Sequence, residues 1–150
     1  MQSEEKKMVN NKRNFWRYIL LTLITLGIYH WIFQYRLIAD VNLMCDGDGQ
    51  TTPGLLKFLF LTIITLGIYG FYWFYKLGNR LSENAPRFHM QFKERGITIL
   101  LWMLLGGLTY GIGWYVAWYL LIRNVNALAG AYNYIYYGNT DCVYSKNTEV

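Results

Sequence analysis

Long uncharged, apolar segments alternate with short polar ones along this chain. Tyr18–Tyr35, Phe58–Tyr75 and Ile97–Ile122 contain no Asp, Glu, Lys or Arg, and they are 18, 18 and 26 residues long. A helix rises about 1.5 Å per residue and the hydrocarbon core of a bilayer is about 30 Å thick. The first two segments are therefore just long enough to cross a bilayer, and the third is amply long. The pattern predicts an all-α integral membrane protein with three transmembrane helices.

An internal repeat underlies this pattern. Leu21–Arg36 and Leu61–Lys76 are identical at nine of sixteen aligned positions, and Thr-Leu-Gly-Ile-Tyr is unchanged in both copies. A looser third copy, Thr109–Gly113, lies in the third segment. We therefore predict a single membrane domain, 15–137, which contains three repeat units between polar tails at 1–14 and 138–150. The units are expected at 15–44, 55–84 and 97–137, and the turn-forming linker 45–54 separates the first two.

The repeated motif is a candidate structural site rather than a chemical one. Its members are Thr25, Gly27, Tyr29, Thr65, Gly67, Tyr69 and Gly111. Glycine inside a helix costs about 1 kcal/mol relative to alanine. The glycines can kink a helix, with the threonine hydroxyl bonding a freed carbonyl, or allow another helix to approach closely, or mark a break at which the threonine caps the second half. We predict kinked helices whose amphipathic extensions lie at the membrane interface.

The basic residues predict an orientation. Lys and Arg number five before the first segment, two in the next connector, five in the following one and two at the C-terminal side. With the excess of positive charge inside, this predicts a multi-pass membrane protein with its N-terminus on the cytoplasmic side, which places Cys45 and Cys142 outside. The alternative is that each unit is a re-entrant wedge with both ends on one side, because half-helices of about eleven residues reach only about 16 Å.

Chemistry-bearing residues are sparse. The sequence contains no hydrolase, nucleotide-binding or zinc-protease motif, so we predict no enzyme activity, no cofactor and no metal. His30 and Gln34 share one helical face and form either a polar spot that lines a pore or an interhelical interface. Asp46–Gly49 is interpreted as a turn because it lacks the spaced ligands of a calcium loop. The net charge of +5 is explained by anionic lipid, and no nucleic acid is expected.

The doubled Thr-Leu-Gly-Ile-Tyr motif, with Trp73, Tyr75, Thr52-Pro53 and Arg123–Asn126, resembles the bacterial membrane family called domain of unknown function 4234. The resemblance covers residues 15 to 134 and implies a prokaryotic membrane protein with no established reaction. We therefore expect a structural or interaction component, a scaffold or anchor, whose partners are the lipid bilayer and either further copies of itself or another membrane protein. An oligomeric channel or carrier for a small or hydrophobic solute is the alternative.

Overall fold

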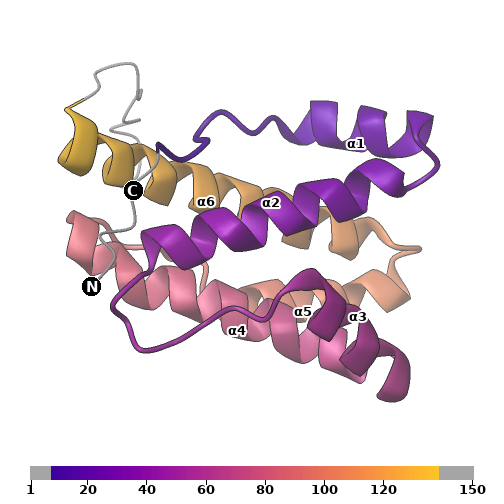
Figure 1. The fold of residues 1–150 in the computed structure, drawn as a ribbon. Helices are drawn as coiled ribbons and strands as arrows, with labels where there is room; N and C mark the ends of the chain where they lie inside the picture. The colour runs from indigo at the N-terminus through magenta and orange to yellow at the C-terminus, as the bar shows by residue number, and fades with distance from the viewer. Residues whose placement is uncertain (1–7, 139–150) are drawn as a thin grey trace.

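The computed structural model describes residues 8–138, and their regular structure is entirely helical (Figure 1). The helices are α1 (Phe15–Ile24), α2 (Ile28–Met44), α3 (Leu55–Ile64), α4 (Ile68–Asn84), a short 3₁₀ helix η1 (Ala85–Phe88), α5 (Gly96–Leu108) and α6 (Ile112–Tyr137). They form three hairpins, α1–α2, α3–α4 and α5–α6. The prediction of an all-helical fold built from repeats describes this arrangement.

The prediction of transmembrane helices is wrong. No helix in residues 8–138 combines the length and the apolar character needed to cross a bilayer. The physical reason is that each uncharged segment folds back on itself at the Thr-Leu-Gly or Thr-Tyr-Gly turn. The two arms of such a hairpin share the segment, so that α1 and α3 have ten residues each and reach about 15 Å.

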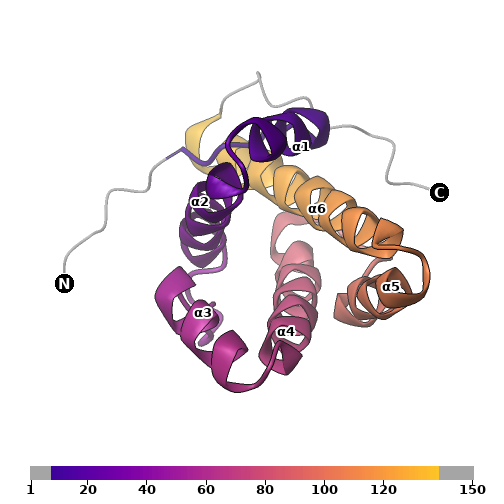
Figure 2. The same cartoon turned by 90° about the vertical axis from the view of Figure 1, so that its right-hand side faces the viewer.

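The predicted membrane localisation, multi-pass with an alternating orientation, is wrong for the same reason. All three hairpin turns lie at one end of the molecule, on the right in Figure 1 and toward the viewer in Figure 2. Both flanks of every uncharged segment therefore lie toward the opposite end. The count of basic residues had assigned successive flanks to opposite sides.

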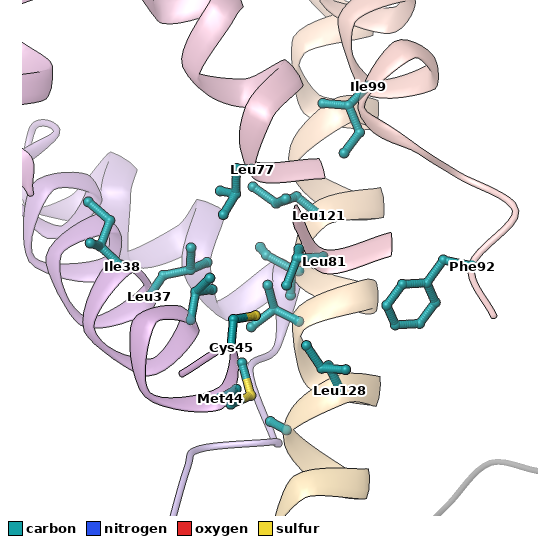
Figure 3. Close-up of a cluster of buried hydrophobic side chains, with 14 of the residues drawn as sticks. Leu37, Ile38, Met44, Cys45, Leu77, Leu81, Phe92, Ile99, Leu121 and Leu128 are labelled. Atoms are coloured by element: carbon teal, nitrogen blue, oxygen red, sulfur yellow. The ribbon is translucent and has the colours of Figure 1, made fainter. Parts of the chain in front are cut away.

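The core lies between the second helices of the three hairpins. Equivalent positions of α2, α4 and α6 meet in layers, and Leu37, Leu77 and Leu121 form one layer with almost no exposed surface (Figure 3). Val41, Leu81 and Val125 form the next layer. The predicted amphipathic extensions are therefore the walls of a shared core, and their apolar stripes face one another instead of a membrane interface.

Glycines allow α5 to pack closely against α4. A Cβ atom on Gly96 would lie 2.0 Å from the carbonyl oxygen of Tyr75, and one on Gly78 would lie 2.7 Å from the Cα of Gly96. Neither position has room for a side chain. At Gly27 and Gly67, in contrast, nothing lies within 4 Å of an added Cβ. Close helix approach thus explains the first pair of glycines and not the repeated ones.

The segment before α1 is held along α6. The side chains of Asn133 and Asn126 each bond both the N–H and the carbonyl of one residue, Val9 and Arg13 respectively, at 2.7–3.2 Å. Arg13 also forms an ion pair with Asp40 on α2. Residues 9–13, assigned from sequence to a polar tail, therefore join the first two helices to the last. Cys45 is fully buried, contrary to its predicted outer exposure, and Cys142 lies outside the described residues.

Candidate functional site

The turn of each hairpin is built by the repeated motif. Leu26 and Gly27 both have positive φ, 50° and 93°, and Leu66 and Gly67 repeat these values closely at 51° and 95°. Two successive left-handed residues end one helix and start the next, and a side chain at the glycine position would be strained. Of the alternatives for the glycines, the structure shows the break between two helices.

Threonine joins the two helices across this break. The hydroxyl of Thr25 donates to the carbonyl oxygen of Leu21 at 2.7 Å and accepts the N–H of Tyr29 at 2.9 Å. Thr65 makes the same pair of bonds, with Leu61 and Tyr69 at the same distances. One hydroxyl thus satisfies a carbonyl at the end of the first helix and an N–H at the start of the second.

The turns leave no backbone N–H free over the six residues that form each of the first two tips. Every N–H from residue 25 to 30, and from 65 to 70, has an acceptor within the hairpin at 2.7–3.2 Å. A turn that is exposed to water does not need internal acceptors for all of its N–H groups, because water can accept these hydrogen bonds. Hydrocarbon offers no acceptor, and each unsatisfied polar group in it costs several kcal/mol.

The side chains around these turns are apolar and exposed. Leu26 and Leu66 are each 94% exposed, and Tyr110, at the same position of the third hairpin, is 103% exposed. The flanking residues are exposed as well. We call the nine exposed residues at equivalent positions of the three turns the tip surface: Ile24, Leu26, Ile28, Ile64, Leu66, Ile68, Leu108, Tyr110 and Ile112. Figure 2 looks onto these turns from outside.

A band of basic and aromatic side chains surrounds the first two hairpins at one depth. Arg17 and Arg36 lie nine and ten residues from Leu26, and Lys57 and Lys76 are placed identically around Leu66. All four are exposed. At about 1.5 Å per residue, they lie about 14–15 Å from the tips. Exposed Trp16 and Tyr35 lie at the same level, where amphipathic rings favour the headgroup region of a bilayer.

A buried polar network holds the linker between α2 and α3 against α4. Arg80 is 3% exposed, and all five of its N–H donors are used. Two bonds go to the Asp48 carboxylate, at 2.7 and 3.0 Å, and the other three go to Asn42, Thr52 and the Gln50 carbonyl.

This network controls the ionisation of Asp48. Burial alone raises the pKa of Asp48, but the hydrogen bonds from Arg80, the Gln50 N–H and Asn84 outweigh it and lower the pKa to about 2. Within the Asp46–Gly49 segment, the carboxylate of Asp48 thus binds an arginine. No group of three or more His, Cys, Asp or Glu side chains in residues 8–138 could hold a metal ion.

Comparison with known proteins decides the family. The family model described as domain of unknown function DUF4234 matches twice, over residues 13–83 and 54–127. The chain belongs to this family. The resemblance seen in the sequence is thereby confirmed, and the overlap of the two matches agrees with the internal repeat. No curated protein and no solved structure matches the chain.

The two DUF4234 matches correspond to the hairpins. The first covers α1–α4 and the second runs from just before α3 into α6, so each match contains two hairpin turns. The motif residues Thr25, Gly27, Thr65, Gly67 and Gly111 all lie in or beside these turns. Tyr29 and Tyr69 lie just beyond them, partly buried, and donate the N–H groups that bond threonine.

The two polar residues of the first hairpin do not form a shared site. His30 Nδ1 lies 2.7 Å from the Tyr18 hydroxyl on α1, and burial lowers the pKa of His30. Gln34 is 1% exposed, and neither atom of its amide has a hydrogen-bond partner in the described residues. Gln34 therefore lies in the core and not on an interface between copies.

Sequence reasoning missed the Arg80 network. The residues that form it are scattered over the end of α2, the linker and α4, and no local spacing joins them. The available signal was a lone arginine beside Leu77 and Leu81, which share one face of a helix at a spacing of four residues. Such an arginine needs a buried partner, and Asp48 supplies it.

Proposed function

We propose that this DUF4234 protein is an interaction protein that docks on a lipid bilayer by inserting its three hairpin tips into one leaflet, without crossing it. The observation that carries the proposal is the tip surface, in which three separate turns expose equivalent apolar residues at one end of the molecule. The proposal contains no catalytic step.

The apolar side chains supply the driving force. Full removal of a leucine or isoleucine side chain from water is worth about 1.5–3 kcal/mol. Several such side chains in the tip surface more than offset the ordering cost of docking. The bonded N–H groups of the first two turns remove the backbone penalty that an ordinary loop would meet in hydrocarbon.

The dimensions of the hairpins agree with insertion into a single leaflet. The arms α1 and α3 are ten residues long, about 15 Å, which is half of a hydrocarbon core of about 30 Å. With the tips near the bilayer centre, the exposed cations at positions 17, 36, 57 and 76 reach the headgroups. Each cation at that level adds about 1 kcal/mol on an anionic surface.

Lipid is favoured over a protein partner by the shape of the surface. Figure 2 shows three turns set apart from one another around the end of the bundle. A fluid hydrocarbon phase can surround all three at once. Self-association, expected from the sequence, and the alternative of an oligomeric channel or carrier stay predictions.

Vesicle flotation tests the proposal. We expect the full chain to float with neutral phosphatidylcholine vesicles, and Leu26→Glu with Leu66→Glu to abolish this. The matched control carries the same two added charges at the far end of α6, Tyr134→Glu with Ile135→Glu, where both residues are exposed. The control should bind like the unaltered protein, and equal loss in both double variants would refute the proposal.

Insertion depth gives an independent measurement. A nitroxide at Leu66→Cys, in a Cys142→Ser background, should be more accessible to oxygen than to a water-soluble nickel complex. Cys45 is buried and should stay unlabelled. A label at Tyr134→Cys should show the opposite preference. A label at position 66 with the accessibility of water would contradict insertion.

A further inference from the structure

We propose that the cavity between the α2–α3 linker and α4 binds the phosphate group of an anionic phospholipid. The inference rests on the proposed docking and assigns it a specific lipid class. The cavity holds about 230 Å³. Pockets for drug-sized ligands hold about 300–1,000 Å³, so this one has room for a headgroup and not for a whole lipid.

The walls of the cavity differ in chemistry from end to end. Gln50 and Thr52 of the linker, with Lys76 and Arg80 of α4, line the part that lies away from the tips. Tyr69 and Tyr72 line the part nearer the tips. A ligand with an anionic head and an apolar continuation toward the bilayer centre matches this order, whereas a free polar metabolite would leave the aromatic part unused.

Lys76 is the cation available to a ligand. Arg80 lines the same cavity, but its five donors are committed to Asp48, Asn42, Thr52 and Gln50 and its charge is balanced by Asp48. No carboxylate in residues 8–138 forms an ion pair with Lys76. Arg80 therefore fixes the linker wall, and Lys76 contributes the uncompensated positive charge.

The depth of the cavity fits a headgroup. Lys76 lies on α4 (Ile68–Asn84), ten residues after Leu66 of the preceding turn, which places it about 15 Å from the tip. That distance is the half-thickness of the hydrocarbon core. The docking that the tips produce therefore brings Lys76 to the level of the lipid phosphates.

A water-soluble lipid separates this site from insertion. Dihexanoyl phosphatidylglycerol, below its micellar concentration, should bind the protein in calorimetry, and Lys76→Gln should weaken it by about tenfold or more, as for loss of a charge-assisted contact. The matched control is Lys93→Gln, an exposed lysine that lies outside both the cavity and the band of basic residues around the tips. The control should change the affinity less than about twofold, and equal effects in the two variants would overturn the proposal.

The choice of ligand identifies the source of the phosphate. Dihexanoyl phosphatidylcholine should bind more weakly than the anionic lipid, and inorganic phosphate more weakly still. Equal affinity for inorganic phosphate would overturn the lipid assignment. With vesicles, the two proposals fail differently: loss of flotation on neutral lipid refutes docking by the tips, whereas flotation without a Lys76-dependent gain on phosphatidylglycerol refutes the headgroup site.

Discussion

Replacement of Arg80 by methionine should be among the most destabilising single changes in this protein. Methionine keeps an unbranched apolar stem but removes five donors, and it leaves the Asp48 carboxylate buried without its cation. The two side chains of this ion pair are 4% and 10% exposed. Breaking a buried pair by removing one partner costs about 3–5 kcal/mol.

The chain offers a matched control in Arg123→Met. Arg123 forms an ion pair with Glu94 in which the side chains are 47% and 26% exposed. Exposed pairs of this kind are worth about 0–1 kcal/mol because solvent screens the charges. The two variants carry the same chemical change, so the difference between them isolates burial.

Urea unfolding followed by circular dichroism, with all variants in the same mild detergent, measures both effects. In thermal unfolding of the same samples, a loss of 3–5 kcal/mol should lower the melting temperature of a chain of this size by about 6–20 °C. The double variant Arg80→Met, Asp48→Leu should recover part of the loss, because no unpaired charge stays buried. An Arg80→Met protein as stable as Arg123→Met would refute the reasoning.

The same network predicts how stability responds to acid. The pKa of Asp48 is lowered from 3.8 to about 2 in the folded protein, so the stabilisation is fully present above pH 4 and is lost as the pH falls toward 2. The shift corresponds to about 2 kcal/mol. Arg80→Met should remove this part of the acid dependence, and an unchanged profile between pH 4 and 2 would contradict the assigned cause.

Two further changes test the packing. Gln34→Met should raise the free energy of unfolding by about 1–3 kcal/mol, since it removes two buried amide atoms without hydrogen-bond partners. A lower urea midpoint for this variant would show that the two amide atoms do form hydrogen bonds. Gly96→Ala should destabilise the protein by about 1–3 kcal/mol, because the added Cβ would overlap the Tyr75 carbonyl. The control is Gly107→Ala in the same helix, where an added Cβ meets nothing within 4 Å and the change should be neutral or stabilising. Equal effects of the two changes on thermal unfolding would argue against the close contact.

The repeat units could be predicted from sequence because the motif is explicit. Thr25–Tyr29 and Thr65–Tyr69 are identical, and glycine beside threonine indicated an interruption. The length of the uncharged segments was misleading, since 18 apolar residues are compatible with one helix across a bilayer or with two shorter helices joined by a turn. The backbone at Leu26 decided between them. A leucine with φ of 50° is uncommon, and no propensity scale predicts it.

The candidate sites were predicted to different degrees. The residues of the tip surface all lie inside the three uncharged segments found in the sequence. Their exposure could not be predicted without the positions of the turns. The buried position of Gln34 was not predicted, because the sequence suggested either a polar spot that lines a pore or an interhelical interface shared with His30. Its equivalents in the other hairpins are Phe74 and Trp118, both buried, and this alignment would have placed Gln34 in the core. The Arg80 network depends on tertiary contacts and needed the structure.

Stability and the proposed docking depend on different halves of this molecule. No hydrophobic side chain in 19–32, 59–72 or 104–116 is buried, whereas the helices beyond these ranges contain the whole of the layered core. The half with the tips therefore contributes little to folding in water, and in the proposed docking its apolar side chains would gain free energy on entering hydrocarbon. Sites that are well separated act almost additively. Changes at Leu26 or Leu66 should then alter vesicle binding with little effect on unfolding, and changes at Arg80 should do the reverse. Independent control of the two properties is what the proposed docking requires, because the protein must keep its fold both on and off the lipid surface.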